Sequence, residues 1–315
     1  MTRRREKPTP SSSAQDGQSM TPARDHGRDT SPASDQARPV GLYLVATPIG
    51  NLGDVSLRAL DVLRSVDAIA CEDKRVTAKL LSAHGIRTPL IAYHDHNAVR
   101  VRPALLERLE RGEAIALVSD AGTPLISDPG YKLVRAARNA ELPVTTVPGA
   151  SAVLAALSLS GLPSDRFFFG GFVPSKAGQR ATFYQELSAV PSTLVLFETP
   201  ARLAASLDEA TKQLGSRQAA VARELTKRFE EVRAGTLAAL AAHYREEGPP
   251  RGEIVLVIGP PGPDAAPADH DIDDRLRAAL ATQSLRDAVD AVTAETGLPR
   301  RTIYQRAIAL NKAPG

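Results

Sequence analysis

The chain has 315 residues, of which 43% are hydrophobic and 24% charged, and its formal net charge is +3. This is globular composition for about two domains, and the weak positive charge does not by itself indicate a nucleic-acid-binding protein. The single cysteine, Cys71, excludes an intramolecular disulfide and a four-cysteine zinc site, so we expect a cytoplasmic protein. Apolar runs such as 254–258 are shorter than the roughly 20 residues of a membrane helix, and no membrane association is expected.

Residues 1–39 are rich in Ser, Pro, Asp and Arg and contain almost no large apolar side chains. Such a segment cannot bury enough surface to offset the entropy lost on ordering, so we predict a disordered tail. The arginines at 3–5 are not followed by an apolar stretch, which argues against a signal peptide.

From Val40 onward, short apolar runs alternate with amphipathic stretches. The pattern predicts strands at 42–46, 67–71, 89–92, 114–118 and 143–147, and helices from 57, near 74–84, at 98–111, at 129–140 and from 150. This alternation is typical of a largely parallel sheet covered on both faces by helices. We therefore assign residues 40–160 to an N-terminal α/β domain.

The second half predicts a different sheet, followed by a separate helical element. We expect strands at 167–171, 193–197, 218–223, 228–234 and 253–258, and helices at 176–189, 200–213 and 236–246. These define a C-terminal α/β domain, 161–259, with a more antiparallel sheet. Residues 260–270 form a linker by composition. Residues 271–315 predict helices near 272–281, 284–295 and 300–311, with spacing that resembles a helix-turn-helix.

Three loops follow predicted strands of the first domain, at residues 47–54, 119–130 and 147–152. In an open α/β sheet, ligands bind beyond the carboxyl ends of the strands, and small residues let the backbone approach them closely. The first loop alone is read more simply as a tight turn, but three such loops at one sheet edge predict a small-molecule site. The chain lacks the phosphate loop and the Gly-x-Gly-x-x-Gly fingerprint, which disfavours ATP hydrolysis and the usual dinucleotide site.

In this order, the loops resemble those of the tetrapyrrole methylase family of S-adenosylmethionine-dependent transferases, over about residues 40–260. Further segments are similar to the branch that methylates small-subunit ribosomal RNA: Cys71-Glu72-Asp73-Lys74-Arg75, Tyr93-His94-Asp95-His96-Asn97, Phe197 to Arg202 and Ala222 to Lys227. One departure is Gly122-Thr123-Pro124, where tetrapyrrole enzymes carry Gly-Asp-Pro. The loss of that acid fits a change of substrate.

The resemblance implies a bilobal α/β fold with a cleft between two domains. It implies methyl transfer from S-adenosyl-L-methionine to the ribose 2′-hydroxyl of a cytidine in the decoding centre of 16S ribosomal RNA, with the small ribosomal subunit as partner and a homodimer as the assembly. By the same match, the cofactor-binding residues are Pro48, Gly50, Thr123, Pro124, Ile126, Ser151, Ala152, Phe197 and Ala222.

A ribose hydroxyl is a poor nucleophile, so a general base or a neighbouring cation should assist it. The catalytic candidates are Glu72, Asp73, His94, Glu224 and Lys227. Lys227 could lower the pKa of the hydroxyl or hold a phosphate, and Glu224 or Asp73 could accept the proton. Simpler readings stay open: Glu224 and Lys227 as a surface pair, and Asp73 with Arg75 as the start of a helix. His94 and His96, two apart on one strand without a third partner, do not predict a metal site.

Basic residues near the C-terminus predict contact with RNA, and the RNA-binding candidates are Arg75, Arg300, Arg301 and Arg306. The alternative for these C-terminal helices is a cap packed on the enzyme. Two other functions remain open for the whole chain. One is a tetrapyrrole (precorrin or uroporphyrinogen) methyltransferase, and the other is a non-enzymatic RNA-binding protein on the same fold.

Overall fold

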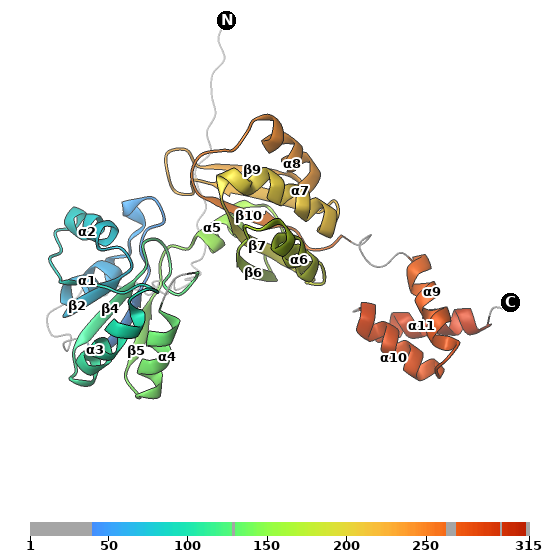
Figure 1. The fold of residues 1–315 in the computed structure, drawn as a ribbon, viewed down its shortest axis with the longest axis horizontal. Helices are drawn as coiled ribbons and strands as arrows, with labels where there is room; N and C mark the ends of the chain where they lie inside the picture. The colour runs from blue at the N-terminus through green and yellow to red at the C-terminus, as the bar shows by residue number, and fades with distance from the viewer. Residues whose placement is uncertain (1–39, 128–129, 263–268, 297, 313–315) are drawn as a thin grey trace, which may run out of the picture. The chain divides into compact units, whose positions relative to one another are not determined.

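The computed structural model describes residues 40–127, 130–262, 269–296 and 298–312 (Figure 1). The predicted disordered tail at 1–39, part of the second loop and most of the predicted linker lie outside the described residues. Among those described, no helix has both the length and the apolar character needed to cross a membrane.

The first sheet is wholly parallel, as the alternating pattern predicted. Its strands, in the spatial order β3-β2-β4-β1-β5, are β1 (Gly41–Val45), β2 (Ala68–Cys71), β3 (Leu90–Ala92), β4 (Ala114–Val118) and β5 (Val144–Val147). The connecting helices are η1 (Leu52–Asp54), α1 (Leu57–Ser65), α2 (Lys74–Ala83), α3 (Ala98–Glu110) and α4 (Tyr131–Asn139). We call this sheet and its helices the N-terminal lobe.

Apolar side chains cover both faces of this sheet, which explains the continuous hydrophobic runs of its strands. On one face, Ile69 packs with Leu60 and Leu63 of α1. On the other, Leu117 packs with Leu105 of α3 and Leu133 of α4. Full burial of each such side chain is worth about 1.5–3 kcal/mol. The layers therefore fix the carboxyl ends of the strands, from which the loops emerge.

The second sheet is mixed, which confirms the more antiparallel prediction. In the order β6-β7-β10-β8-β9, its strands are β6 (Phe167–Phe172), β7 (Thr193–Glu198), β10 (Ile254–Ile258), β8 (Gln218–Arg223) and β9 (Glu231–Thr236). Only β6 and β7 pair in parallel. Its helices are η2 (Pro200–Arg202) and α6 (Ala177–Ser188), α7 (Leu203–Leu214) and α8 (Leu237–Glu246). We call this unit the C-terminal lobe.

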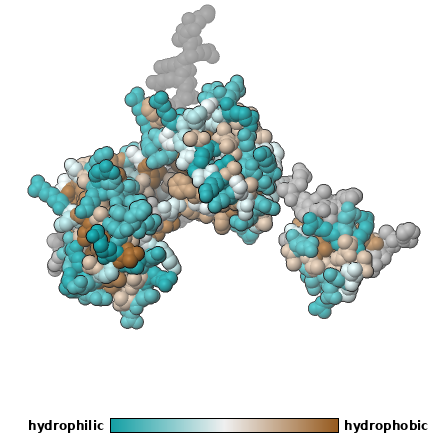
Figure 2. Space-filling model, viewed as in Figure 1, coloured by the Kyte–Doolittle hydropathy of each residue, from teal (hydrophilic) through white to brown (hydrophobic). Residues whose placement is uncertain are grey.

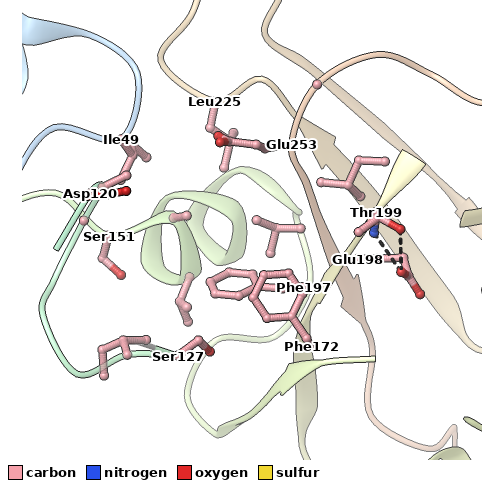
Figure 3. Close-up of a pocket in the computed structure, with 18 of the residues that line it drawn as sticks. Ile49, Asp120, Ser127, Ser151, Phe172, Phe197, Glu198, Thr199, Leu225 and Glu253 are labelled. Atoms are coloured by element: carbon pink, nitrogen blue, oxygen red, sulfur yellow. Dashed lines mark hydrogen bonds between the residues drawn. The ribbon is translucent and has the colours of Figure 1, made fainter. Parts of the chain in front are cut away.

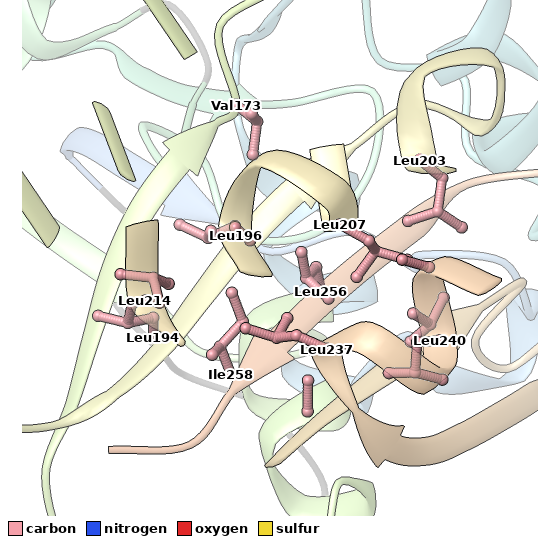
Figure 4. Packing of buried hydrophobic residues seen from close by; sticks show 14 of the residues in the cluster. Val173, Leu194, Leu196, Leu203, Leu207, Leu214, Leu237, Leu240, Leu256 and Ile258 are labelled. Carbon is pink, nitrogen blue, oxygen red and sulfur yellow. The ribbon is translucent and has the colours of Figure 1, made fainter. Parts of the chain in front are cut away.

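One face of the second sheet packs on the α6–α8 layer. Leu194, Leu196 and Leu256 from the strands meet Leu207 of α7 and Leu240 of α8 (Figure 4). The opposite face packs on α5 (Ala152–Leu159), through Val153, Ala156 and Leu157. Helix α5 directly follows a strand of the first sheet but buries its side chains against the second, so it ties the two lobes together.

Three local predictions were wrong in detail. Strand β9 begins at Glu231 rather than 228, because residues 226–230 form a turn in which the Glu230 N–H donates to the Lys227 carbonyl (3.1 Å). The region predicted as one helix at 200–213 opens with the 3-10 turn η2. His94 and His96 lie in a turn rather than on a strand, since Asn97 Oδ1 accepts the His94 N–H (2.9 Å). Side-chain-to-backbone hydrogen bonds of this kind leave no trace in hydrophobic periodicity.

The C-terminal helices have a hydrophobic core of their own. They are α9 (Asp269–Leu280), α10 (Leu285–Thr296) and α11 (Arg300–Lys312), and α9 begins inside the predicted linker. Leu276, Val289, Val292 and Ile303 form the centre of this core. Hydrophilic residues are prominent on the face seen in Figure 2, as expected when the apolar residues lie in the cores of the two lobes and of the C-terminal helices.

Candidate functional site

Hydrogen bonds hold the three loops of the N-terminal lobe together. The Thr47 N–H donates to the Gly122 carbonyl (2.9 Å), and the Gly122 N–H donates back to Thr47 (3.0 Å). The Thr123 hydroxyl then donates to the Ala150 carbonyl (3.2 Å). The predicted convergence of the three loops is therefore confirmed for their described residues. Gly122 has φ +82°, a conformation that glycine adopts without the steric cost of a Cβ.

The first loop also touches the C-terminal lobe. A Cβ placed on Gly50 would lie 2.5 Å from Lys227 Cγ, 2.8 Å from Thr226 Oγ1 and 2.9 Å from the Leu225 carbonyl oxygen. Only glycine permits this approach of the two chain segments. The contact brings the end of β8 against the edge of the first sheet.

A cavity of about 360 Å³ lies where these segments meet (Figure 3). Figure 3 shows Ile49, Asp120 and Ser151 from the N-terminal lobe, and Phe172, Phe197 and Glu253 from the C-terminal lobe. Its wall is Ile49, Asp120 to Thr123, Ile126, Ser127, Ser151 to Val153, Phe172, Phe197 to Pro200, Leu225 and Gly252 to Val255. Apolar walls with a few convergent hydroxyls and carboxylates are typical of small-molecule sites.

A second cavity of about 250 Å³ adjoins the first, because Ile49, Asp120, Ala121 and Glu253 belong to both walls. Its remaining wall comes from the first loop, from α2, from Ser119 of the second loop and from one residue beyond β8: Thr47, Pro48, Gly50, Leu52, Val76, Thr77, Lys79, Leu80, Ser119 and Lys227. Two lysines, Lys79 and Lys227, one from each lobe, line this second space together with the two acids Asp120 and Glu253.

Lys227 is held between two carboxylates. Its Nζ donates to Glu224 Oε1 (2.7 Å) and to Glu253 Oε2 (3.0 Å). Burial disfavours its charge, but the hydrogen bonds to the two carboxylates outweigh burial and raise the pKa of Lys227. The hydrogen bond from Lys227 in turn lowers the pKa of Glu224. Lys227 is therefore a fixed cation, and Glu224 is a weak proton acceptor.

Asp73 begins helix α2, which is one of the two interpretations that the sequence left open for this residue. Its carboxylate accepts the Arg75 N–H (2.8 Å) and pairs with the Arg75 guanidinium (2.7 Å). The hydrogen bonds from Arg75 lower the pKa of Asp73 to about 2. Burial, with the charges of Asp120 and Asp95 next, instead raises the pKa of Glu72. Glu72, Asp73 and His94 line neither cavity.

The structure distributes the other predicted residues between several places. Lining the first cavity are Thr123, Ile126, Ser151, Ala152 and Phe197, whereas Pro48 and Gly50 line the second. Pro124 lies beside the first cavity wall without forming it, and Ala222 is fully buried in the core between α5 and the second sheet. Their roles toward a cofactor remain predictions.

The predicted RNA-binding arginines are mostly paired. Arg75 pairs with Asp73, Arg300 with Asp290 (2.6 Å) and Arg306 with Asp273 (2.5 Å). Arg301 is exposed and has no ion pair with the described residues. Within the same described ranges, no group of three or more His, Cys, Asp or Glu could hold a metal ion.

Sequence reasoning missed several wall residues, chiefly Asp120, Phe172 and the segment 252–255. Asp120 lies in a loop that the sequence analysis had singled out, and its place two residues after the end of a strand was the available signal. The other two depend on strand pairing: β10 is antiparallel to its neighbours, so Ile254 lies opposite Glu198 and Arg223 at the ends of β7 and β8.

Left-handed backbone conformations occur in two segments that contribute residues to the cavity walls. Leu125 (φ 75°) and Ser127 (φ 63°) in the second loop, and Glu224 (φ 51°) and Thr226 (φ 64°) beyond β8, have left-handed conformations. Such conformations cost of order 1–3 kcal/mol each in a non-glycine residue, and they cluster at ligand-binding sites.

Together these features define a two-lobed α/β protein with a ligand cleft at the carboxyl edge of a parallel sheet. The chain matches the family model of Tetrapyrrole (Corrin/Porphyrin) Methylases over residues 41–241, and that of the RsmI C-terminal HTH domain over 265–311. Similar folds occur in a diphthine synthase (16% identity, TM-score 0.54, covering 69% of this chain and 89% of that chain) and a cobalt precorrin-4 methyltransferase (15%, 0.52, 69% and 94%).

Curated relatives are much closer in sequence. The ribosomal RNA small subunit methyltransferase I of Mesorhizobium japonicum is 50% identical over 284 residues, covering 89% of this chain and 96% of its own. The protein of the same name from Erythrobacter litoralis is 53% identical over 270 residues, covering 86% and 95%. The chain belongs to the tetrapyrrole methylase family, in the branch of ribosomal RNA small subunit methyltransferase I.

Proposed function

We propose that this chain transfers a methyl group from S-adenosyl-L-methionine to 16S ribosomal RNA of the small subunit, at the ribose 2′-hydroxyl of a cytidine in the decoding centre. The observation that carries the proposal is the 360 Å³ cavity at which the three hydrogen-bonded loops meet the second sheet. We infer the RNA substrate from the names of the relatives given above. We infer the ribose hydroxyl and the cytidine from the family resemblance described in the sequence analysis.

The residues of the first cavity fit this cofactor. The rings of Phe172 and Phe197 offer an apolar face to an adenine, and the hydroxyl of Ser151 and loop N–H groups suit its polar atoms. When bound, the cofactor supplies an electrophilic methyl group, and the protein supplies alignment and electrostatics.

The second cavity then receives the acceptor nucleotide. Lys227 and Lys79 line it, and a protonated Lys227 attracts a phosphate or stabilises negative charge that develops on the hydroxyl oxygen. Glu224 and Glu253 hold the Lys227 ammonium in place. Exclusion of water from the cavities by the bound ligands would strengthen these interactions.

Other parts of the chain have supporting roles in this proposal. The exposed Arg301 of α11 and the exposed head of Arg75 contact the phosphate backbone. The protein acts in the cytoplasm as a homodimer, whose interface would cover the exposed rings of Phe167 and Phe168 on the edge strand β6. Light scattering tests the dimer, and a mass of one chain would contradict it.

Tritium transfer from labelled cofactor tests the function. We expect label in small ribosomal subunits and none in uroporphyrinogen or precorrin. Label in the porphyrinogen alone would establish the tetrapyrrole alternative. Failure to bind S-adenosylhomocysteine by calorimetry would instead favour a non-enzymatic RNA-binding protein.

A further inference from the structure

The two cavities share part of their walls, and the shared part contains two acidic residues, Asp120 and Glu253. Glu253 is committed to an ion pair, because its Oε2 accepts from Lys227 Nζ (3.0 Å). Asp120 makes no ion pair within the described part of the chain. Of the two acids in the shared wall, Asp120 is therefore the one whose carboxylate has no ion pair with the described residues.

The position of Asp120 is fixed from two sides. It lies two residues after the end of β4, and the carbonyl of the intervening Ser119 accepts from the Thr47 hydroxyl (3.2 Å). Asp120 Oδ1 accepts the Asp73 N–H at the start of α2 (3.0 Å). No hydrogen bond joins Oδ2 to another described residue. One oxygen anchors the side chain, and the other remains available to a ligand.

We propose, on the basis of the function proposed above, that Asp120 is a catalytic residue that accepts a hydrogen bond from the attacking ribose hydroxyl and then takes its proton. The hydroxyl oxygen forms a bond to the methyl carbon, and the carbon–sulfur bond breaks with its electron pair remaining on sulfur. The proton passes to Asp120 Oδ2 and from there to water, so the carboxylate is regenerated. A positioned base of this kind contributes about 10²- to 10⁴-fold to the rate.

The other acids near the site are less suited to this role. Glu72 and Asp73 line neither cavity, and both oxygens of the Asp73 carboxylate accept hydrogen bonds from Arg75. Glu224 is bound to Lys227 and lies on the wall of a different hollow. A proton acceptor must reach the hydroxyl within about 2.6–3.2 Å at the moment of attack. Asp120 and Glu253 line both cavities, and of these two acids only Glu253 is paired with Lys227.

The test uses Asp120→Asn in the full-length protein. Asparagine keeps an oxygen to accept the Asp73 N–H, but it has no carboxylate to take a proton. The measurements are kcat and KM for methyl transfer to small subunits, affinity for S-adenosylmethionine and for S-adenosylhomocysteine by calorimetry, and thermal stability. Asp61→Asn, on the exposed surface of α1, is the charge-matched control.

We expect kcat to fall about 10²- to 10⁴-fold in Asp120→Asn, with both cofactor affinities within about threefold of wild type and unchanged thermal stability. Retention of kcat within about threefold would overturn the proposal. Selective weakening of the cationic S-adenosylmethionine would overturn it too, since Asp120 would then serve the sulfonium charge. If the wild type itself fails to label small subunits, the proposed function has failed, whatever the variant does.

Discussion

Replacing Gly50 with alanine places a methyl group at the contact between the first loop and the segment that follows β8. The added Cβ would lie 2.5 Å from Lys227 Cγ and 2.9 Å from the Leu225 carbonyl oxygen, whereas ordinary contacts are 3.4–4 Å. Neither neighbour is the free end of a flexible side chain. The two segments must therefore move apart, and both cavity walls move with them.

Overpacking of this kind costs about 1–3 kcal/mol. A cost of that size corresponds to about 5- to 150-fold in affinity if it falls on the closed, ligand-bound arrangement. We expect Gly50→Ala to weaken binding of S-adenosylhomocysteine within that range and to lower methyl transfer. In a chain of this size we also expect the melting temperature to fall by roughly 2–4 °C for each kcal/mol.

Calorimetry and thermal melting measure both effects, and Gly53→Ala is the matched control in the same loop. A Cβ on Gly53 meets only Asn51 Oδ1, at 3.3 Å, so this variant should stay close to wild type. If Gly50→Ala binds the cofactor and melts like the wild type, the two lobes do not meet at this contact when ligand is bound. The reasoning from the shared cavity wall would then be refuted.

Three further perturbations probe separate parts of the account. Lys227→Met should lower methyl transfer about 100-fold. Its affinity for the cofactor, measured by calorimetry, should stay close to wild type because Lys227 lines the second cavity and not the first. An equal loss of methyl transfer and of cofactor affinity would contradict the placing of Lys227 on the acceptor side. Ionised Asp73 stabilises the fold at pH values above 3.8, its pKa in the unfolded chain, because the hydrogen bonds from Arg75 lower its pKa to about 2 in the folded protein. The difference in urea-melt stability between wild type and Asp73→Ala should therefore vanish as the pH falls toward about 2. A difference that persists at that pH would argue against the Arg75 pairing as its cause. Arg301→Ala should reduce the salt slope of RNA binding by about one unit without loss of stability, whereas Arg306→Ala should destabilise the C-terminal helices. An unchanged slope in Arg301→Ala would exclude that phosphate contact.

The helices and strands could be predicted well from the sequence because a buried position requires an apolar residue, and the order of apolar residues therefore indicates the type of element. The five residues of β4 are all buried between two helix layers, and an unbroken apolar run records this. The three loops could be predicted as a common site because parallel strands bring their carboxyl ends to one edge. The packing of α5 on the second sheet could not be predicted in this way, because almost every residue of this helix is apolar and no single buried face can be recognised.

The catalytic side of the site was less accessible to sequence reasoning. Residue type alone could not distinguish Asp73, which is bound to Arg75, from Asp120, which has one oxygen free of hydrogen bonds to the described residues. The difference depends on contacts between loops far apart in the chain. Likewise, the segment 252–255 reaches the cavity only because β10 inserts between β7 and β8.

The most direct test of the central claim is mass spectrometry of 16S ribosomal RNA from cells that lack this protein. We predict that one ribose methyl on a decoding-centre cytidine is absent, that the wild-type gene restores it, and that Gly50→Ala restores it only in part. If the RNA of the deletion strain keeps every ribose methyl found in the parent strain, the cleft between the two lobes does not serve 16S ribosomal RNA methylation.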